Sequence, residues 1–273
     1  MEKELILLDG SAGTVLWKLA EEAGKPRLPV WRYNIEAPEL VKALHKLYID
    51  AGSRMVQTNT FSATVPAVER DGSYSPEQVI TAAAELALGA TDGSSVIPYL
   101  SFGPLTQLLA PYGKLTEQEC RDIYRRMIGA GLSAGIKELA LETFMDIRML
   151  KIAAEEALEL GLQPMCSMTF EKRRRSMMGD SVEKIVAALE PLGVKAVGMN
   201  CSHGPVEALE IIREFSEKTS LPLYFKPNSG MGESYDAACF AREIAPALEL
   251  VSFVGGCCGC DSEYIRKLSA LIQ

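Results

Sequence analysis

Short apolar runs recur along the chain, and segments of mixed polarity separate them. Each run has the length of a β-strand and is apolar through most of its residues. Strands of this kind are typical of a parallel sheet, whose strands are buried on both faces. The eight runs cover residues 4–9, 54–61, 94–100, 137–144, 163–170, 194–200, 221–227 and 250–256.

The segments between these runs have the pattern of amphipathic helices. Residues 37–52 place their apolar side chains on one helical face and end at Gly52, a residue suited to ending a helix. Ser75 precedes a proline, which makes a good N-cap and first turn, and Thr116 with Glu119 forms a capping box. The predicted helices cover residues 37–52, 75–90, 116–131, 146–161, 181–192, 205–219, 235–247 and 261–272.

Eight strands that alternate with eight helices predict an α/β fold, a single (β/α)8 TIM barrel. A doubly wound open sheet fits the same periodicity and stays as the alternative. We find no linker, low-complexity tract or short repeat, so we expect one domain over residues 1–273. In a barrel, the carboxyl ends of all strands meet at one rim, where catalytic groups are found.

Composition and charge exclude several classes of protein. The chain has 273 residues, is 48% hydrophobic and has a formal net charge of −8. An acidic chain is a poor partner for nucleic acid or an anionic membrane. The first residues do not resemble a signal peptide, and no apolar run approaches the ~20 residues of a membrane span. We therefore expect a cytoplasmic protein whose seven cysteines stay reduced.

Three cysteines fall at the carboxyl ends of predicted strands. Cys201 follows the sixth strand, and the adjacent pair Cys257 and Cys258 follows the eighth, among glycines that allow a tight bend. Neighbouring cysteines are poor partners for a disulfide with each other. Thiolates converging from two strand ends suit zinc, which binds cysteine sulfur. The alternative is that these are small residues buried by packing.

The chain resembles the homocysteine S-methyltransferase family over essentially its whole length. The matching stretches are LDGSAGT (8–14), TNTFSAT (58–64), LETFMDI (141–147), MTFEKRRRSMMGD (168–180), GMNCSHGP (198–205), KPNSG (226–230) and VGGCCG (254–259). NCS together with GGCCG is highly specific. The context is most similar to the homocysteine-binding module of cobalamin-dependent methionine synthase.

The resemblance implies a zinc-dependent methyltransferase that methylates the thiol of homocysteine to form methionine. It implies that Cys201, Cys257 and Cys258 are the zinc ligands and the catalytic centre. Zinc would hold the substrate's sulfur as a thiolate.

The rest of homocysteine needs partners of its own. We expect Asp9 and Glu142 to receive its ammonium group. The turn from Gly10 through Gly13 to Thr14 would offer N–H groups to its carboxylate at the start of a helix. Asn228 would occupy or adjoin the fourth position of the zinc, with an ordinary turn as the alternative. Asn59 and Asn200 are expected to support the rim.

Three residues depart from the family pattern. Cys260 stands where a threonine is common, and we do not assign it to zinc. His203 follows Cys201 where an apolar residue is expected, and a surface position is the simpler interpretation. Lys226 stands where an acidic or aromatic residue is expected.

The methyl donor is the open question. The chain printed here contains one barrel, so we expect the donor to be separate, and methylcobalamin on a partner corrinoid protein is favoured. The alternative is a small donor such as S-methylmethionine, S-adenosylmethionine or a betaine. Two further hypotheses are a zinc- or thiol-binding protein without catalysis, and an enzyme for selenocysteine or another thiol acceptor.

Overall fold

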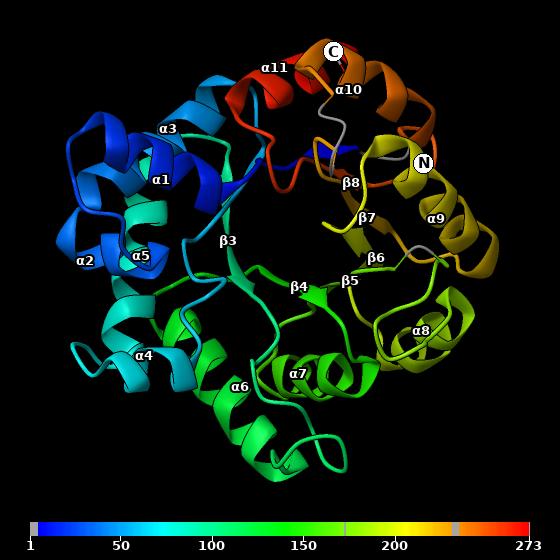
Figure 1. The fold of residues 1–273 in the computed structure, drawn as a ribbon, viewed down its shortest axis with the longest axis horizontal. Coiled ribbons are helices and arrows are strands. Elements are labelled where there is room, and N and C mark those ends of the chain that lie inside the picture. Colours follow the sequence, from blue (N-terminus) through cyan, green and yellow to red (C-terminus); the bar gives the residue numbers. More distant parts are fainter. Residues whose placement is uncertain (1–4, 172, 231–234, 273) are drawn as a thin grey trace.

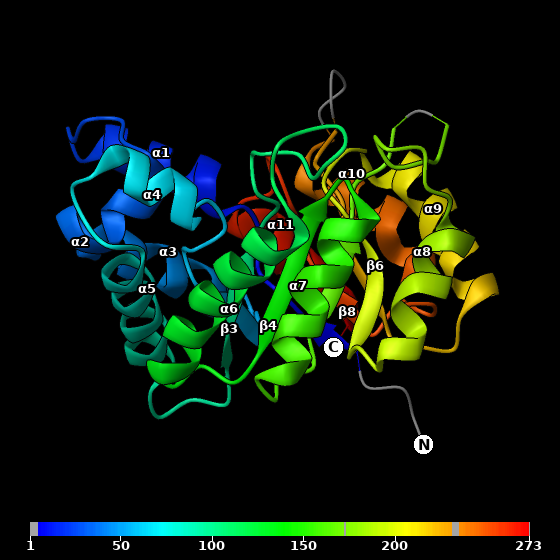
Figure 2. The same ribbon diagram turned by 90° about the horizontal axis from the view of Figure 1, so that it is seen from below.

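In the computed structural model, which describes residues 5–171, 173–230 and 235–272, eight parallel strands form the predicted barrel. Figure 1 shows the helices as a ring around these strands, and Figure 2 shows the same barrel from the side. The strands are β1 (Ile6–Leu7), β2 (Met55–Gln57), β3 (Ile97–Phe102), β4 (Leu139–Phe144), β5 (Met165–Met168), β6 (Ala196–Asn200), β7 (Leu223–Lys226) and β8 (Phe253–Val254).

The strand order excludes the open sheet. Hydrogen-bonded neighbours run from β2 in sequence to β8, and β8 then pairs with β1. The backbone N–H of Arg54 donates to the carbonyl of Leu7 over 2.7 Å and joins the remaining pair, β1 and β2. The eight strands therefore form a nearly closed barrel, as the sequence predicts.

All eight predicted helices form within a few residues of the expected bounds. The α-helices are α1 (Ala12–Glu22), α2 (Tyr33–Glu36), α3 (Pro38–Asp50), α4 (Val65–Asp71), α5 (Pro76–Thr91), α6 (Glu117–Ser133), α7 (Ile147–Glu159), α8 (Val182–Leu189), α9 (Pro205–Lys218), α10 (Ala237–Ile244) and α11 (Ser262–Ile272). Three short 3-10 helices are η1 (Val30–Arg32), η2 (Glu190–Leu192) and η3 (Ala245–Ala247). The capping boxes at Ser75 and Thr116 are both present. The first predicted strand includes Glu4, which lies outside the described residues.

The apolar side chains form two cores. The larger core lies between the strands and the helices that surround them. The smaller core fills the barrel and takes one residue from each strand or its end: Leu8, Met55, Tyr99, Ala140, Met165, Ala196, Tyr224 and Phe253. This apolar layer closes the lower barrel, so polar groups at the carboxyl ends of the strands lie above a packed floor.

None of the described helices has both the length and the apolar character that a membrane crossing requires.

Candidate active site

The three predicted cysteines meet at the carboxyl ends of β6 and β8. The sulfur atoms of Cys201, Cys257 and Cys258 all lie within 4.8 Å of one another. The sulfur atoms of Cys201 and Cys258 are 3.7 Å apart. Cys258 is exposed, and the other two are partly buried, so the cluster is open to solvent on one side. Three sulfurs this close can bind one metal ion.

The backbone around the cluster adopts conformations that side chains usually avoid. Cys201 has a φ of 59° and Ser202 a φ of 56°, both in the left-handed region that is uncommon for residues other than glycine. Hydrogen bonds maintain this turn: Cys201 N–H donates to the Lys226 carbonyl over 3.0 Å, and His203 N–H donates to the Cys201 carbonyl over 2.7 Å. The turn directs the Cys201 thiol toward the pair on β8.

Glycines shape the loop that holds the cysteine pair. Gly259 has a φ of 83°, which glycine adopts without strain. Gly255 and Gly256 have no positive φ, so they do not supply the bend expected of them. An added Cβ at Gly256 would lie 2.4 Å from the Cβ of Cys260. These two glycines instead permit a close approach of the chain.

The thiols strongly influence one another's ionisation. Hydrogen bonds from the thiols of Cys257 and Cys258 lower the pKa of Cys201 far below its usual value. The same contacts, together with burial, raise the pKa of Cys257, and contact with Cys201 raises that of Cys258 to about 11. One thiolate is thus stabilised by two thiols that donate to it. This is the donor set that a thiophilic metal would complete by displacing the remaining protons.

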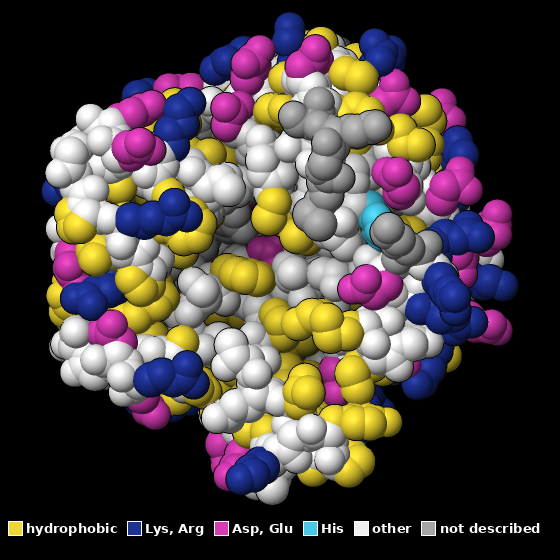
Figure 3. Space-filling view, viewed as in Figure 1, with side chains coloured by type: hydrophobic (Ala, Val, Ile, Leu, Met, Phe, Trp, Pro, Cys, Tyr) yellow, Lys and Arg dark blue, Asp and Glu magenta, His cyan; other side chains and the backbone are white. Residues whose placement is uncertain are grey.

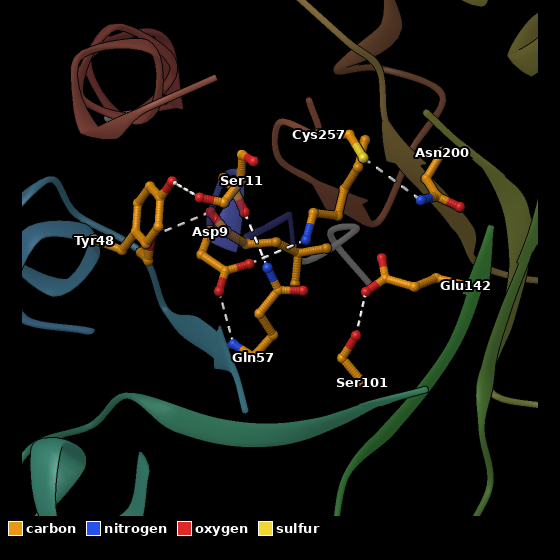
Figure 4. A network of polar contacts seen from close by, with 12 residues as sticks. Asp9, Ser11, Tyr48, Gln57, Ser101, Glu142, Asn200 and Cys257 are labelled. Carbon is orange, nitrogen blue, oxygen red and sulfur yellow. Dashed lines mark hydrogen bonds and ion pairs between the residues drawn. The ribbon is translucent and has the colours of Figure 1, made fainter. Parts of the chain in front are cut away.

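Two asparagines adjoin the cluster. Asn228 accepts a hydrogen bond from the Cys258 N–H over 3.1 Å, while its Nδ2 is buried without a hydrogen-bond partner among the described residues. This amide also contributes to lowering the Cys201 pKa. Asn200 points its Nδ2 at the Cys257 sulfur over 3.7 Å (Figure 4). The asparagines therefore place N–H donors beside sulfurs that would be thiolates in a metal site.

A bulge in β4 positions Glu142. The register between β4 and β5 shifts between Leu141 and Phe144, and Thr143 has a φ of 65°. Bulges of this kind re-aim the neighbouring side chain. Asn200 stabilises the bulge, because its Oδ1 accepts from the Thr143 N–H and its Nδ2 donates to the Thr143 hydroxyl, both over 2.7 Å.

Glu142 is 4% exposed, and its hydrogen-bond partners among the described residues are neutral hydroxyls. Ser101 donates a short hydrogen bond to one oxygen, and Tyr224 donates to the other over 3.0 Å. No ion pair to Glu142 is present among the described residues. Lys226 interacts electrostatically with Glu142 but forms its ion pair with Asp9, so Glu142 can still pair with a cation from outside the protein.

Asp9, the other predicted carboxylate, has a different environment. Its Oδ2 accepts from the Gln57 N–H over 2.7 Å, and its Oδ1 accepts from the Tyr99 hydroxyl over 3.0 Å. The ammonium of Lys226 also lies 3.0 Å from Oδ1, and both side chains of this ion pair are 2% exposed. Figure 4 shows Asp9 and Glu142 on different sides of the polar network.

The predicted turn opens α1 at the rim. Ser11 is the N-cap and accepts from the Thr14 N–H over 3.4 Å, so this N–H has a partner within the turn. Gly13 is partly buried, and Thr14 is exposed. An added Cβ at Gly10 would lie 2.4 Å from the Cys260 carbonyl oxygen, so only glycine fits between the two strand ends.

Three other residues that the sequence singled out lie outside the sulfur cluster. Cys260 is buried, and burial raises the pKa of its thiol, which points at the Pro227 carbonyl and is not part of the sulfur cluster. His203 is partly exposed in the loop after Cys201. Asn59 does not contact the sulfurs; its Nδ2 donates to the Val30 carbonyl over 2.7 Å and holds η1 against the barrel. The sequence reasoning missed the buried hydroxyls of Ser101, Tyr99 and Tyr224 around the carboxylates.

The face that contains the site is hollowed. Figure 3 shows the depression near the middle of the face, with an acidic side chain visible at its bottom. Large apolar side chains are exposed in the loops that follow several strands, at Phe61, Leu108, Tyr112 and Met177, and in the first turn of α9, at Val206.

Comparison with known proteins gives one family. The model of the family described as homocysteine S-methyltransferase matches residues 6–272. The methionine synthase of Mycobacterium tuberculosis is 27% identical over 263 residues, covering 88% of this chain and 22% of that protein. The methionine synthase of Mycobacterium leprae is 27% identical over 266 residues, with the same coverage. The chain thus spans about a fifth of the length of these relatives.

Solved structures show the same fold. The homocysteine methyltransferase MmuM from Escherichia coli, in its metallated form, superposes with a TM-score of 0.84 at 24% identity and covers 98% of this chain and 96% of that one. Its oxidised form gives a TM-score of 0.83 at 24% identity, with the same coverage.

Proposed function

The chain belongs to the homocysteine S-methyltransferase family, and from this premise we propose that it transfers a methyl group to the thiol of homocysteine to form methionine. The substrate's sulfur would attack the methyl carbon and form the new carbon–sulfur bond. The bond between the methyl group and its donor would break, and its electron pair would stay with the donor. The observation that supports this most strongly is the convergence of three thiols at the same rim as a buried carboxylate, Glu142, that has no ion pair among the described residues.

We propose that Cys201, Cys257 and Cys258 hold zinc. Tetrahedral zinc with Zn–S bonds of ~2.3 Å requires sulfurs about 3.8 Å apart. The 3.7 Å separation of the Cys201 and Cys258 sulfurs fits this requirement. The unpartnered amide of Asn228 also fits, since it would donate toward a thiolate or adjoin the fourth position. When bound, zinc would keep the substrate's sulfur deprotonated at neutral pH.

The remaining residues would hold the amino-acid end of the substrate. Glu142 is the proposed ammonium partner, with Asp9 as the second buried carboxylate nearby. The N-terminus of α1, from Gly10 through Gly13 to Thr14, would receive the carboxylate. Ser101 and Tyr224 donate to Glu142 and so keep its carboxylate in place. Recognition at two ends would orient the sulfur toward the donor.

For the donor, we propose methylcobalamin on a separate corrinoid protein. A small sulfonium or betaine is usually held by aromatic ring faces or negative charge. Of the phenylalanines at strand ends, Phe102, Phe144 and Phe170 are buried in the outer core and cannot form such a cage. Phe61 is 39% exposed, and other apolar side chains surround the site at loop tips. This pattern suits contact with another protein.

A methyl-transfer assay tests the proposal. Zinc-loaded protein would be mixed with homocysteine and, in parallel, with methylcobalamin, S-methylmethionine or a betaine, and methionine would be measured. We expect slow but measurable turnover with free methylcobalamin. Rapid turnover with S-methylmethionine and none with methylcobalamin would refute the proposed donor. The proposed methylation of homocysteine would still stand. Zinc binding without methionine from any donor would instead support a zinc- or thiol-binding protein without catalysis.

A further inference from the structure

Lys226 is the one residue of the site whose charge the proposed chemistry does not use. It ends β7 and is only 1% exposed. Its ammonium lies 3.0 Å from Asp9 Oδ1 and 3.1 Å from the Tyr99 hydroxyl. A lysine this deeply buried is rare unless it is paired. Its position beneath the rim therefore depends on Asp9.

The two carboxylates of the site are consequently unequal. Asp9 already has a cation within hydrogen-bond distance, and both of its oxygens accept hydrogen bonds. Glu142 accepts only from Ser101 and Tyr224, which carry no charge. Lys226 also acts on Glu142 electrostatically, but without an ion pair. An incoming ammonium therefore gains more from Glu142 than from Asp9, which is already paired.

The charges of these three buried residues add to minus one. Asp9 and Glu142 each contribute one negative charge, and Lys226 contributes one positive charge. A single substrate ammonium makes the group neutral. A thiol that lacks the ammonium leaves Glu142 desolvated and unpaired, which is costly.

We propose that Lys226 is a specificity-determining residue: by pairing with Asp9, it leaves Glu142 as the carboxylate that receives the substrate's ammonium and limits how strongly the site prefers a thiol with an amino group. This inference rests on the proposed function and goes beyond it, since it assigns the two carboxylates different roles. Asp9 positions Lys226, and Glu142 binds the substrate.

The test compares homocysteine with 4-mercaptobutanoate, which is homocysteine without its amino group. Dissociation constants for both are measured by calorimetry on zinc-loaded protein at roughly pH 7, where the amino group is cationic. The selectivity is the ratio of the constant for 4-mercaptobutanoate to that for homocysteine. In the wild type we expect a ratio on the order of 100, as for a hydrogen bond between charged groups.

Three variants separate the roles. Glu142→Gln should reduce the ratio to within about threefold of one, because the charged contact is lost. Lys226→Met should raise the ratio by about tenfold, because a second negative charge then attracts the ammonium and repels the anionic analogue. The double variant Asp9→Asn/Lys226→Met restores a group charge of minus one and should return the ratio to the wild-type value.

Lys195→Met is the matched control. The Lys195 ammonium pairs with Glu138 over 2.5 Å, just before β6 and β4, at the opposite end of the barrel. Removing this lysine should leave the ratio unchanged. Zinc content measured on each variant confirms that the sulfur cluster is intact.

The outcomes distinguish this inference from the proposed function. If the double variant loses selectivity as Glu142→Gln does, Asp9 contacts the ammonium and our assignment is wrong. An unchanged ratio in Lys226→Met would also overturn it. A wild-type protein that does not bind homocysteine would instead refute the proposed function.

Discussion

The buried ion pair between Asp9 and Lys226 predicts strong energetic coupling that can be measured without substrate. The charged atoms are 3.0 Å apart, and each side chain is 2% exposed. Removing one partner of a buried pair costs about 3–5 kcal/mol, because the other charge stays buried without compensation. Removing both partners is often nearly neutral.

For each single substitution, of Asp9 or of Lys226, the structure suggests a loss of stability at the lower end of this range. After Lys226→Met, Asp9 still accepts from the Gln57 N–H and the Tyr99 hydroxyl. After Asp9→Asn, the amide oxygen can still accept from Lys226. We therefore expect each single variant to lose about 3 kcal/mol and the double variant to lie within about 1 kcal/mol of the wild type. The coupling energy is then about 5–7 kcal/mol, the sum of the two single losses minus the change in the double variant.

The assay is urea unfolding of the metal-free, reduced protein, with the four members of the double-mutant cycle compared at equal slope. The control cycle uses Lys46 and Asp50, which pair over 2.9 Å on α3 with side chains 75% and 53% exposed. A pair this exposed should couple by at most about 0.5 kcal/mol. The charged atoms of the two ion pairs are nearly the same distance apart, so the two cycles differ mainly in the burial of the pair.

The pH dependence of the cycle also has a definite sign. Burial is the largest single influence on the Lys226 ammonium and lowers its pKa. Asp9, together with Tyr224, Glu142 and Cys257, more than offsets this effect, so the pKa lies above its usual range. A raised lysine pKa contributes stability that is present below the unfolded value of ~10.4 and is lost above the folded value. The coupling should thus persist through neutral pH. Single variants that each cost less than about 1 kcal/mol, with a double variant equal to their sum, would refute the argument.

Three further predictions concern the metal, the substrate and a buried histidine. The protein should bind about one zinc ion per chain. Elemental analysis should find the zinc lost in Cys257→Ala and retained in Cys260→Ala. Loss of zinc in Cys260→Ala would contradict the ligand assignment. Homocysteine binding near neutral pH should release a proton as its thiol becomes a thiolate; calorimetry in buffers of different ionisation enthalpy counts it, and no release would mean that the sulfur does not reach the metal. Burial lowers the pKa of His45 to about 4, and the charge of Asp9 opposes this only in part. The contribution of neutral His45 to the free energy of unfolding is therefore fully present above the unfolded pKa of ~6.5. It should fall by up to about 3 kcal/mol as the pH drops toward 4. Urea unfolding of the metal-free protein should show a shallower pH dependence for His45→Leu, whereas the partly exposed His203→Gln should keep the wild-type slope; equal slopes in all three proteins would contradict this assignment.

The regular elements of the fold could be predicted because each has a strong local signal. Buried strands give apolar runs, and the helices covering them give a stripe with helical period. The helix α1 was expected only as a helix start at the turn from Gly10 to Thr14 and was given no range. Two shorter helices were missed because their local signal is weak. α2 has four residues and α4 has seven, too few for the helical period to stand out. The position of α2, for example, depends on a tertiary contact, the hydrogen bond that Asn59 donates to Asn34 Oδ1 over 2.8 Å.

The geometry of Glu142 could not be predicted from its surroundings in the sequence. Its aim depends on the bulge at Thr143, whose φ is 65°. A β-branched residue disfavours this conformation, so local preference argues against the bulge. Asn200, 57 positions away, overrides this preference with two side-chain hydrogen bonds. Glu142 was identified from the resemblance, but what holds it in place is visible only in three dimensions.

The inward direction of Lys226 follows from strand alternation, but its partner does not follow from the sequence. Along β7, Tyr224 belongs to the core inside the barrel and Phe225 to the core outside it, so strand alternation directs Lys226 inward. An inward lysine needs an anion, and Asp9 and Glu142 are the two candidate acids at the carboxyl ends of the strands. Sequence separation does not choose between them, since the pair that forms is 217 positions apart. The closed barrel does choose: β7 and β1 both flank β8, whereas β4 lies three strands from β7. Closure therefore places Asp9 beside Lys226 and leaves Glu142 as the carboxylate that we propose for the substrate's ammonium.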